Sequence, residues 1–174
     1  MKWREEHRKK KELSEEAQHL GGIHEKYAVE SNKTLRKGDF YVTKHSNLCE
    51  AHVMFHMTSD ESVMSNSINS RHPVVMGLRN VLKTACLSDV TTVTLPLLLT
   101  HEMSEEMTVP WCMKRAELVF KCVKGFLMEV SSWGGSEIKT LQFLVPKSID
   151  QDVFDRLTSM LSSIFRTSNP IWGK

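Results

Sequence analysis

The feature that most constrains the fold of this chain is a repeated change of hydrophobic pattern after residue 38. Short apolar or alternating segments are followed by longer segments that carry apolar residues at helical spacing. The predicted strands are 39–43, 51–57, 90–99 and 138–145, and the predicted helices begin near 71, 108 and 148. This order indicates an α/β domain: a three-layer α/β/α sandwich whose mixed sheet is mostly parallel and joined by right-handed crossovers.

Local signals describe some of these elements more closely. Thr108 is expected to cap the second helix, and the spacing of Ser148 and Gln151 is that of a capping box before the third. The polar segment 58–70 has no periodicity and is expected to be a loop. The strand at 90–99 is apolar over its second half, so we expect it to be central in the sheet and buried on both sides.

Length and composition bound the class of protein. The 174 residues are enough for one domain with a sizeable core, and 25% charged with 40% hydrophobic residues is a globular composition. The formal net charge of +2 is too small to indicate a nucleic-acid or anionic-lipid surface. No apolar run approaches the roughly 20 residues of a membrane-spanning helix, so we expect a soluble intracellular protein that does not insert into membranes.

We divide the chain into a charged N-terminal helix and linker at 1–33, the α/β domain at 34–168 and a C-terminal tail at 169–174. Its cysteines lie in apolar segments without a Cys-x-x-Cys pair, which favours reduced core thiols over a zinc site or a disulfide framework. They are Cys49, Cys86, Cys112 and Cys122. The sequence also lacks the glycine and serine motifs of acyl, phosphoryl and hydride transfer, so we predict no catalytic residue, no cofactor and no metal site.

Two histidines share one face of the strand predicted at 51–57. His52 and His56 are four residues apart, so at roughly 3.3 Å per residue they lie about 13 Å from each other. This distance is too long for two ligands of one metal ion. We therefore interpret them as polar residues that face a loop or pack under a helix.

A second polar cluster follows the strand predicted at 90–99. Its members are His101, Glu102, Glu105 and Glu106. They lie past the carboxyl end of that strand, where open parallel sheets form their ligand sites. The alternative is a solvated loop before the predicted helix cap, because the zinc-binding His-Glu-x-x-His pattern is absent.

Large amphipathic side chains, which are enriched at interface hot spots, suggest a surface for a partner. The group comprises Trp111, Trp133 and Trp172 with Met103, Met107 and Met113. Core packing is the competing explanation. For Trp133 and Trp172 the two explanations are evenly balanced, and for Met113 core packing is favoured. Together with the acidic pair, the candidate partner surface is Trp133, Trp172, Glu105 and Glu106.

Two resemblances extend this interpretation. The segments 38–43, 52–56 and 77–96, with the helix-strand-helix tail, resemble the later two thirds of a macrodomain in order and spacing. Long uninterrupted runs resemble the C-terminal region of the subunit 3 family of the FERRY endosomal Rab-effector complex, over roughly 34–165. These runs are Arg-His-Pro at 71–73, Met-Ser-Glu-Glu-Met at 103–107, Val-Pro-Trp-Cys at 109–112 and the segment 115–126.

The second resemblance implies a non-enzymatic subunit of an early-endosomal complex that binds an activated Rab GTPase and links endosomes to messenger RNA. The expected partners are other subunits of that complex, with the Rab GTPase and messenger RNA contacted through the complex. The expected location is the cytoplasmic surface of early endosomes. The family protein is considerably longer than this chain, and the first strands of a macrodomain sheet have no counterpart here.

Binding or hydrolysis of ADP-ribose, the ligand of macrodomains, is the alternative function. The macrodomain phosphate loop is rich in glycine because backbone amides must approach the diphosphate closely. The corresponding segment here, 97–102, has no glycine, and Glu102, Glu105 and Glu106 would repel a diphosphate that they faced. We therefore expect no ADP-ribose hydrolysis, and a direct RNA contact through the basic N-terminal segment is a third hypothesis.

Overall fold

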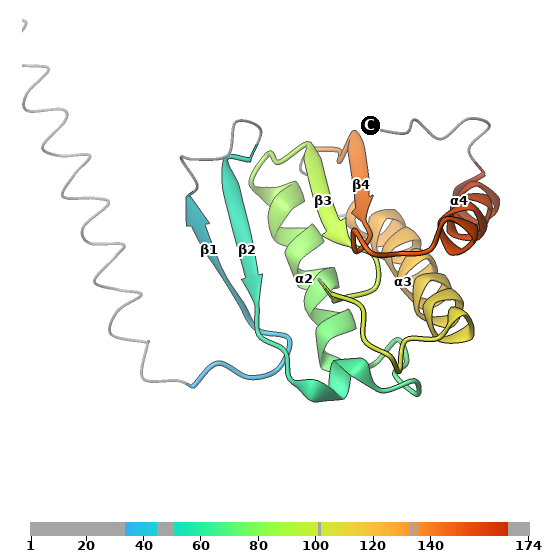
Figure 1. Ribbon diagram of the computed structural model, residues 1–174. Coiled ribbons are helices and arrows are strands. Elements are labelled where there is room, and N and C mark those ends of the chain that lie inside the picture. Colours follow the sequence, from blue (N-terminus) through green and yellow to red (C-terminus); the bar gives the residue numbers. More distant parts are fainter. Residues whose placement is uncertain (1–33, 45–50, 101, 133, 135, 167–174) are drawn as a thin grey trace, which may run out of the picture. The chain divides into compact units, whose positions relative to one another are not determined.

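The computed structural model describes residues 34–44, 51–100, 102–132, 134 and 136–166. The chain divides into two compact units, Met1–Leu35 and Arg36–Lys174, and every element described below belongs to the second. In chain order the elements are β1 (Phe40–Lys44), β2 (Val53–Met57), η1 (Glu61–Met64), α2 (Pro73–Leu87), β3 (Thr92–Pro96), α3 (Val109–Val130), β4 (Thr140–Leu144) and α4 (Gln151–Phe165) (Figure 1). The helix predicted within 1–33 and the tail predicted at 169–174 lie outside the described residues.

The three α-helices begin near the predicted positions, with one correction to their caps. Pro73 occupies the first turn of α2, where its missing N–H is tolerated. Thr108 caps α3 as predicted, its side chain accepting a hydrogen bond from a first-turn backbone N–H at 3.4 Å. The capping box predicted at Ser148 is wrong, because Asp150 caps α4 and accepts a hydrogen bond from the Asp152 N–H at 2.8 Å.

The described strands form two two-stranded sheets, which corrects the predicted single, mostly parallel sheet. β1 and β2 pair in antiparallel fashion, with Tyr41 opposite His56. β3 and β4 pair in parallel across the α3 connection, with Thr94 opposite Gln142. The mixed α/β class is confirmed, whereas the macrodomain-like three-layer sandwich is not. Strand pairing depends on residues far apart in the chain, and hydrophobic periodicity does not report it.

β3 is buried on one face, which corrects the prediction of a strand buried on both. Val93 and Leu95 are 6% and 4% exposed, whereas Thr92 and Thr94 between them are exposed. On the exposed face the Thr94 hydroxyl donates a hydrogen bond to the Gln142 side-chain oxygen at 2.8 Å. β3 therefore has the period-two pattern of a strand with one solvated face.

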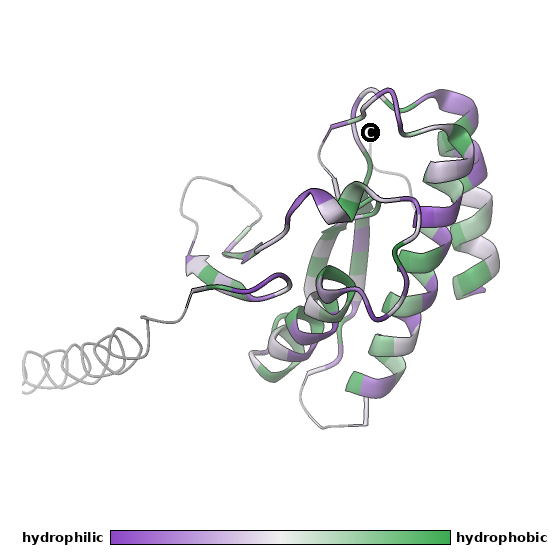
Figure 2. Cartoon of the chain, turned by 90° about the horizontal axis from the view of Figure 1, so that it is seen from below, coloured by the Kyte–Doolittle hydropathy of each residue, from purple (hydrophilic) through white to green (hydrophobic). Residues whose placement is uncertain are grey.

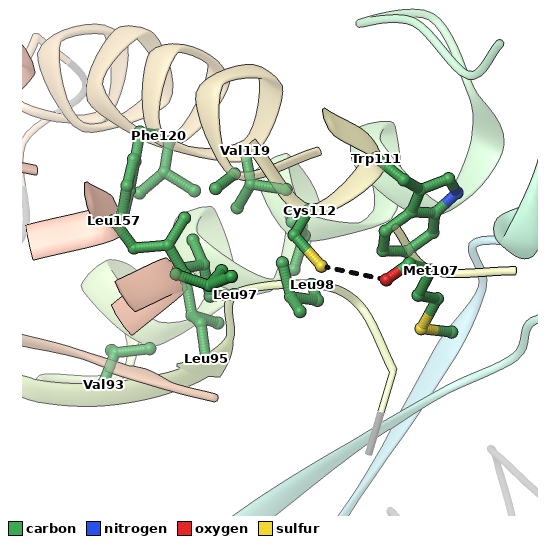
Figure 3. Packing of buried hydrophobic residues seen from close by; sticks show 14 of the residues in the cluster. Val93, Leu95, Leu97, Leu98, Met107, Trp111, Cys112, Val119, Phe120 and Leu157 are labelled. Atoms are coloured by element: carbon green, nitrogen blue, oxygen red, sulfur yellow. Dashed lines mark hydrogen bonds between the residues drawn. The ribbon is translucent and has the colours of Figure 1, made fainter. Parts of the chain in front are cut away.

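The hydrophobic core brings together buried residues of α2, β3, α3 and α4, and Figure 3 shows part of this cluster. Leu82 of α2, Val119 and Phe120 of α3 and Leu157 of α4 are 0–3% exposed. The Phe120 ring also meets the Phe143 ring of β4 edge to face, with the centroids 4.9 Å apart. The parallel strand pair is thereby fixed against the helices by side-chain packing.

The helices carry hydrophobic and hydrophilic residues on different sides, and both kinds are visible on each helix in Figure 2. On the polar side, Arg79 of α2 donates a hydrogen bond from Nε to Glu129 of α3 at 2.8 Å, which links these two helices. Among the residues that the structure describes, no helix is both long and apolar enough to cross a membrane.

A close glycine contact joins the β1–β2 hairpin to α2. Gly38 has a φ of +83°, a left-handed conformation that favours glycine, and a Cβ there would lie 2.2 Å from the Pro73 carbonyl oxygen. A Cβ at Gly77 would lie 2.5 Å from the Gly38 carbonyl oxygen. The hairpin and α2 therefore approach so closely that a side chain at either glycine would displace backbone.

Candidate functional site

The single-turn 3₁₀ helix η1 lies in the segment 58–70 that the sequence pattern predicted as a loop. Asp60 is its N-cap and accepts a hydrogen bond from the Ser62 backbone N–H at 3.2 Å. The side chain of Lys37 forms an ion pair with Asp60. Hydrogen bonds from Lys37 and Ser62 lower the pKa of the Asp60 carboxyl from 3.8 to about 2, so the cap is ionised at neutral pH.

A groove opens between η1, the segment that precedes α3, and the first turn of α3. Its volume is about 770 Å³, and ligand pockets typically measure roughly 300–1,000 Å³. Three carboxylates line it, Glu61 from η1 and Glu105 and Glu106 from the segment before α3. Met64 and Trp111 contribute the apolar part of its lining. This feature is termed the acidic groove below.

Trp111 and Arg115 connect the walls of the acidic groove. The indole Nε1–H of Trp111 donates a hydrogen bond to the Met64 carbonyl oxygen at 3.0 Å. The Arg115 guanidinium carbon lies 4.3 Å from the centroid of the Trp111 ring, a cation–π contact. Arg115 also donates hydrogen bonds to the carbonyl oxygens of Ser65, at 2.9 Å, and Leu98, at 3.2 Å. Figure 3 shows Trp111 beside the core residues that anchor this wall.

A buried arginine and a partly buried histidine near the groove are not indicated by the sequence motifs. Arg115 is 3% exposed, and burial lowers the pKa of its guanidinium from 12.5 to about 10, so it keeps its charge at neutral pH. His72 has its Nε2 atom 3.2 Å from the Ser62 hydroxyl, and burial followed by the Arg115 charge lowers its pKa below 6.5. The sequence does contain one indication of the role of Arg115. It lies four residues after Trp111 on a predicted helix, and this spacing places both side chains on one face.

Two of the four residues predicted for a partner surface line the acidic groove. These are Glu105 and Glu106, both exposed. Trp133 and Trp172 lie outside the described residues, as does His101. Glu102 is exposed but does not line the groove. The structure therefore joins the acidic pair to Glu61, which lies about 40 residues earlier in the chain and had no sequence signal of its own.

The other tryptophan and methionine candidates belong mainly to the core. Trp111 is 4% exposed and Met107 is 6% exposed, so core packing is the dominant role of both. Met103 and Met113 are partly buried and pack against the same cluster, which confirms the core assignment of Met113. Of these four residues, only Trp111 also lines the acidic groove.

The two predicted histidine positions have separate environments. His56 forms a hydrogen bond with the Thr43 hydroxyl at 2.8 Å and stacks on the Tyr41 ring with the centroids 4.6 Å apart. His52 is exposed and precedes β2. In the described part of the chain, no group of three or more His, Cys, Asp or Glu side chains is placed to hold a metal ion.

The predicted core location is confirmed for two of the cysteines, Cys86 and Cys112. Cys86 and Cys112 are buried, Cys122 is partly buried, and all three are free thiols. The Cys86 thiol donates a hydrogen bond to the Ser136 carbonyl oxygen at 3.0 Å. Burial raises the pKa of the Cys112 and Cys122 thiols, which keeps them protonated at neutral pH. Cys49 lies outside the described residues.

The loop after β3 is built as core rather than as a phosphate cradle. Leu97 and Leu98 are 2% and 0% exposed, and Arg115 takes the Leu98 carbonyl oxygen as an acceptor. Side chains therefore fill the position at which a glycine-rich loop would offer backbone amides to a diphosphate. The nearby Glu105 and Glu106 add negative charge at the groove. This geometry gives no support to the ADP-ribose alternative.

The described fold and groove define a small mixed α/β module with an acidic surface groove. The chain belongs to the family described as Ferry endosomal RAB5 effector complex subunit 3, which matches residues 1–171. Similar curated proteins carry the same description in Rattus norvegicus, at 52% identity over 163 residues, and in Homo sapiens, at 58% identity over 134 residues. These alignments cover 92% and 77% of this chain, but only 30% and 24% of the relatives.

The chain thus spans about a quarter to a third of the length of these relatives. No solved structure matches it. Family membership confirms the resemblance to subunit 3 of the endosomal Rab-effector complex, whereas the resemblance to macrodomains gains no support from the comparisons.

Proposed function

We propose that this chain is a non-enzymatic, partner-binding module of an endosomal RAB5 effector complex. The observation that carries the proposal is the family match over residues 1–171, since the relatives are described as subunits of such a complex. A subunit needs surfaces for its neighbours, and the acidic groove is a hollow with exposed charged walls. The macrodomain-like sandwich is not part of the proposal, because the described strands form two separate sheets.

The finer assignment is that the module meets other subunits directly and meets a Rab GTPase and messenger RNA through the complex, at the cytoplasmic surface of early endosomes. The groove limits how RNA is contacted. Its carboxylates, Glu61, Glu105 and Glu106, repel phosphate groups, whereas RNA-binding surfaces neutralise phosphates with Lys and Arg. An RNA contact made by this chain therefore lies away from the groove. Trp133 and Trp172 stay in the proposed partner surface together with Glu105 and Glu106.

The proposal is tested by affinity purification of the tagged chain from cytosol, followed by mass spectrometry of the recovered proteins. Recovery of the other subunits of a RAB5 effector complex, above the level obtained with a tag-only control, supports it. The same protein preparation is titrated with ADP-ribose by calorimetry. Micromolar binding of ADP-ribose without recovery of complex subunits overturns the proposal in favour of a ligand-binding module.

A further inference from the structure

We propose that the acidic groove binds a segment of a partner protein that carries Lys or Arg side chains. The inference rests on the proposed function, because it assigns one contact through which the module meets its partners. The charge, the lining and the fixed walls of the groove indicate that the occupant is a peptide segment with positive charge.

The groove is lined by negative charge, and no cationic side chain is among the described residues that line it. Glu61, Glu105 and Glu106 are exposed and line the groove, and no Lys or Arg lines it with them. Of the ion pairs among the described residues, none includes these three carboxylates. Of the nearby cations, Lys37 pairs with Asp60 and Arg115 donates to two carbonyl oxygens. The exposed Lys114 lines a small adjoining hollow that shares Asn66 and Trp111 with the groove.

The lining of the groove suits the rest of a Lys or Arg side chain as well as its charge. Lys and Arg bury their aliphatic stems along apolar surface while the charged group stays with polar partners. Here the partly buried Met64 provides most of the apolar lining, and the small accessible part of Trp111 adds to it. Ser104 lines the same hollow and supplies a hydroxyl group for the peptide backbone, whereas the Ser65 hydroxyl is hydrogen-bonded to Ser67. A volume of about 770 Å³ accommodates a few residues of an extended segment.

The walls are fixed before a ligand arrives, which lowers the entropic cost of binding. The Asp60 cap holds η1, and the bond from the Trp111 indole to the Met64 carbonyl ties the end of η1 to α3. Arg115 ties the Ser65 carbonyl to the same helix. Glu61 therefore lines the same hollow as the acidic pair but from a different element, and a cationic segment in the hollow has carboxylates from both elements available to it.

The test compares a groove variant with a variant of equal charge change. The groove variant is Glu105→Gln/Glu106→Gln, and the control is Glu102→Gln/Glu137→Gln, at two exposed carboxylates that do not line the groove. The probe is a fluorescently labelled peptide in which Arg alternates with Gly, and its binding is followed by fluorescence anisotropy at low and at physiological salt. A peptide with Glu in place of Arg serves as the probe of opposite charge.

We expect the groove variant to bind the Arg peptide about three- to tenfold more weakly than the unmodified chain, because each partly exposed charge pair contributes modestly. At physiological salt the control variant should keep its affinity within about twofold, since neither of its carboxylates lines the groove and exposed charges outside it are screened. Equal weakening in both variants shows a response to net charge alone and overturns the inference. Absence of binding by the unmodified chain, or equal binding of the Glu peptide, also overturns it.

The same variants in the affinity purification separate this inference from the proposed function. If the unmodified chain and the control recover complex subunits and the groove variant recovers fewer of them, the groove is the contact. If all three recover the subunits equally, the inference fails while the proposed function stands. If the unmodified chain recovers none, the proposed function itself fails. Circular dichroism of each variant checks that the fold is retained, as expected for exposed carboxylates without ion pairs.

Discussion

Replacing the buried Arg115 by Met tests whether its hydrogen bonds hold the wall of the acidic groove. The substitution keeps much of the side-chain length but removes the donors to the Ser65 and Leu98 carbonyl oxygens and the contact over the Trp111 ring. Leu98 is fully buried, so its carbonyl loses a partner that water does not readily replace, at a cost of about 1–3 kcal/mol. The carbonyl of Ser65, an exposed residue, can bond to water and contributes little to this cost.

Loss of the cation–π contact adds about 1 kcal/mol to this destabilisation, since the Arg115 guanidinium is desolvated against the indole. The methionine in turn avoids the cost of burying a charge, which amounts to several kcal/mol for a fully desolvated ion but less where carbonyl groups solvate it. We therefore expect Arg115→Met to lower the free energy of unfolding by about 1–3 kcal/mol. Loss of the wall should also weaken binding of the Arg peptide at the groove.

The assay is urea unfolding followed by circular dichroism, with Lys114→Met as the matched control. Lys114 is exposed on the same helix, so removal of its charge should change the free energy of unfolding by no more than about 0.5 kcal/mol. Arg115→Lys keeps the charge but lacks the planar fork that reaches two carbonyls and stacks on an indole, so it should recover only part of the loss. An Arg115→Met variant as stable as the unmodified chain, or more stable, would refute the structural role of this residue.

Two further predictions address packing and charge elsewhere in the described chain. Gly77→Ala places a Cβ 2.5 Å from a backbone oxygen and should destabilise the fold by more than about 1 kcal/mol. Gly125→Ala adds a Cβ with no atom within 4 Å and should stabilise α3 by about 0.5–1 kcal/mol. Thermal unfolding should therefore shift the melting temperatures of the two variants in opposite directions, and equal shifts would contradict the prediction. Because Lys37 holds the pKa of Asp60 at about 2 rather than 3.8, the unfolded chain binds more protons between these values, so stability falls as the pH is lowered through this range. Asp60→Asn should remove this part of the acid dependence, measured as a flatter loss of stability below pH 3.8 than in the unmodified chain, and an unchanged slope would argue against the ion pair.

The periodicity of α2 and α3 located both helices, because a helix is built from contacts three and four residues apart and its signals lie in one short stretch. The cap at Thr108 is local in the same way and was found. The cap of α4 was misplaced at Ser148 instead of Asp150, because both residues are good N-caps within three positions of each other. For β3, the alternation of Thr and hydrophobic residues over 92–95 was available in the sequence and indicates one solvated face.

The candidate site was only partly accessible from sequence. Glu105 and Glu106 were identified as an acidic pair at the carboxyl end of a strand, but their partner in the groove, Glu61, comes from a segment interpreted as a loop. Arg115 was not identified, since a charged residue on a predicted helix is usually exposed. Its burial depends on acceptors at Ser65 and Leu98, which are 50 and 17 residues away.

The sequence by itself determined the mixed α/β class, the approximate starts of the three α-helices, the family and the acidic character of the segment before α3. Only the tertiary structure decided that the strands pair as two separate sheets, that β3 leaves one face to solvent, and that three carboxylates meet around Met64 and Trp111. The physical reason is the range of the interactions. Helix periodicity and caps act within a few residues, whereas strand pairing and the burial of Arg115 depend on which distant segments come into contact.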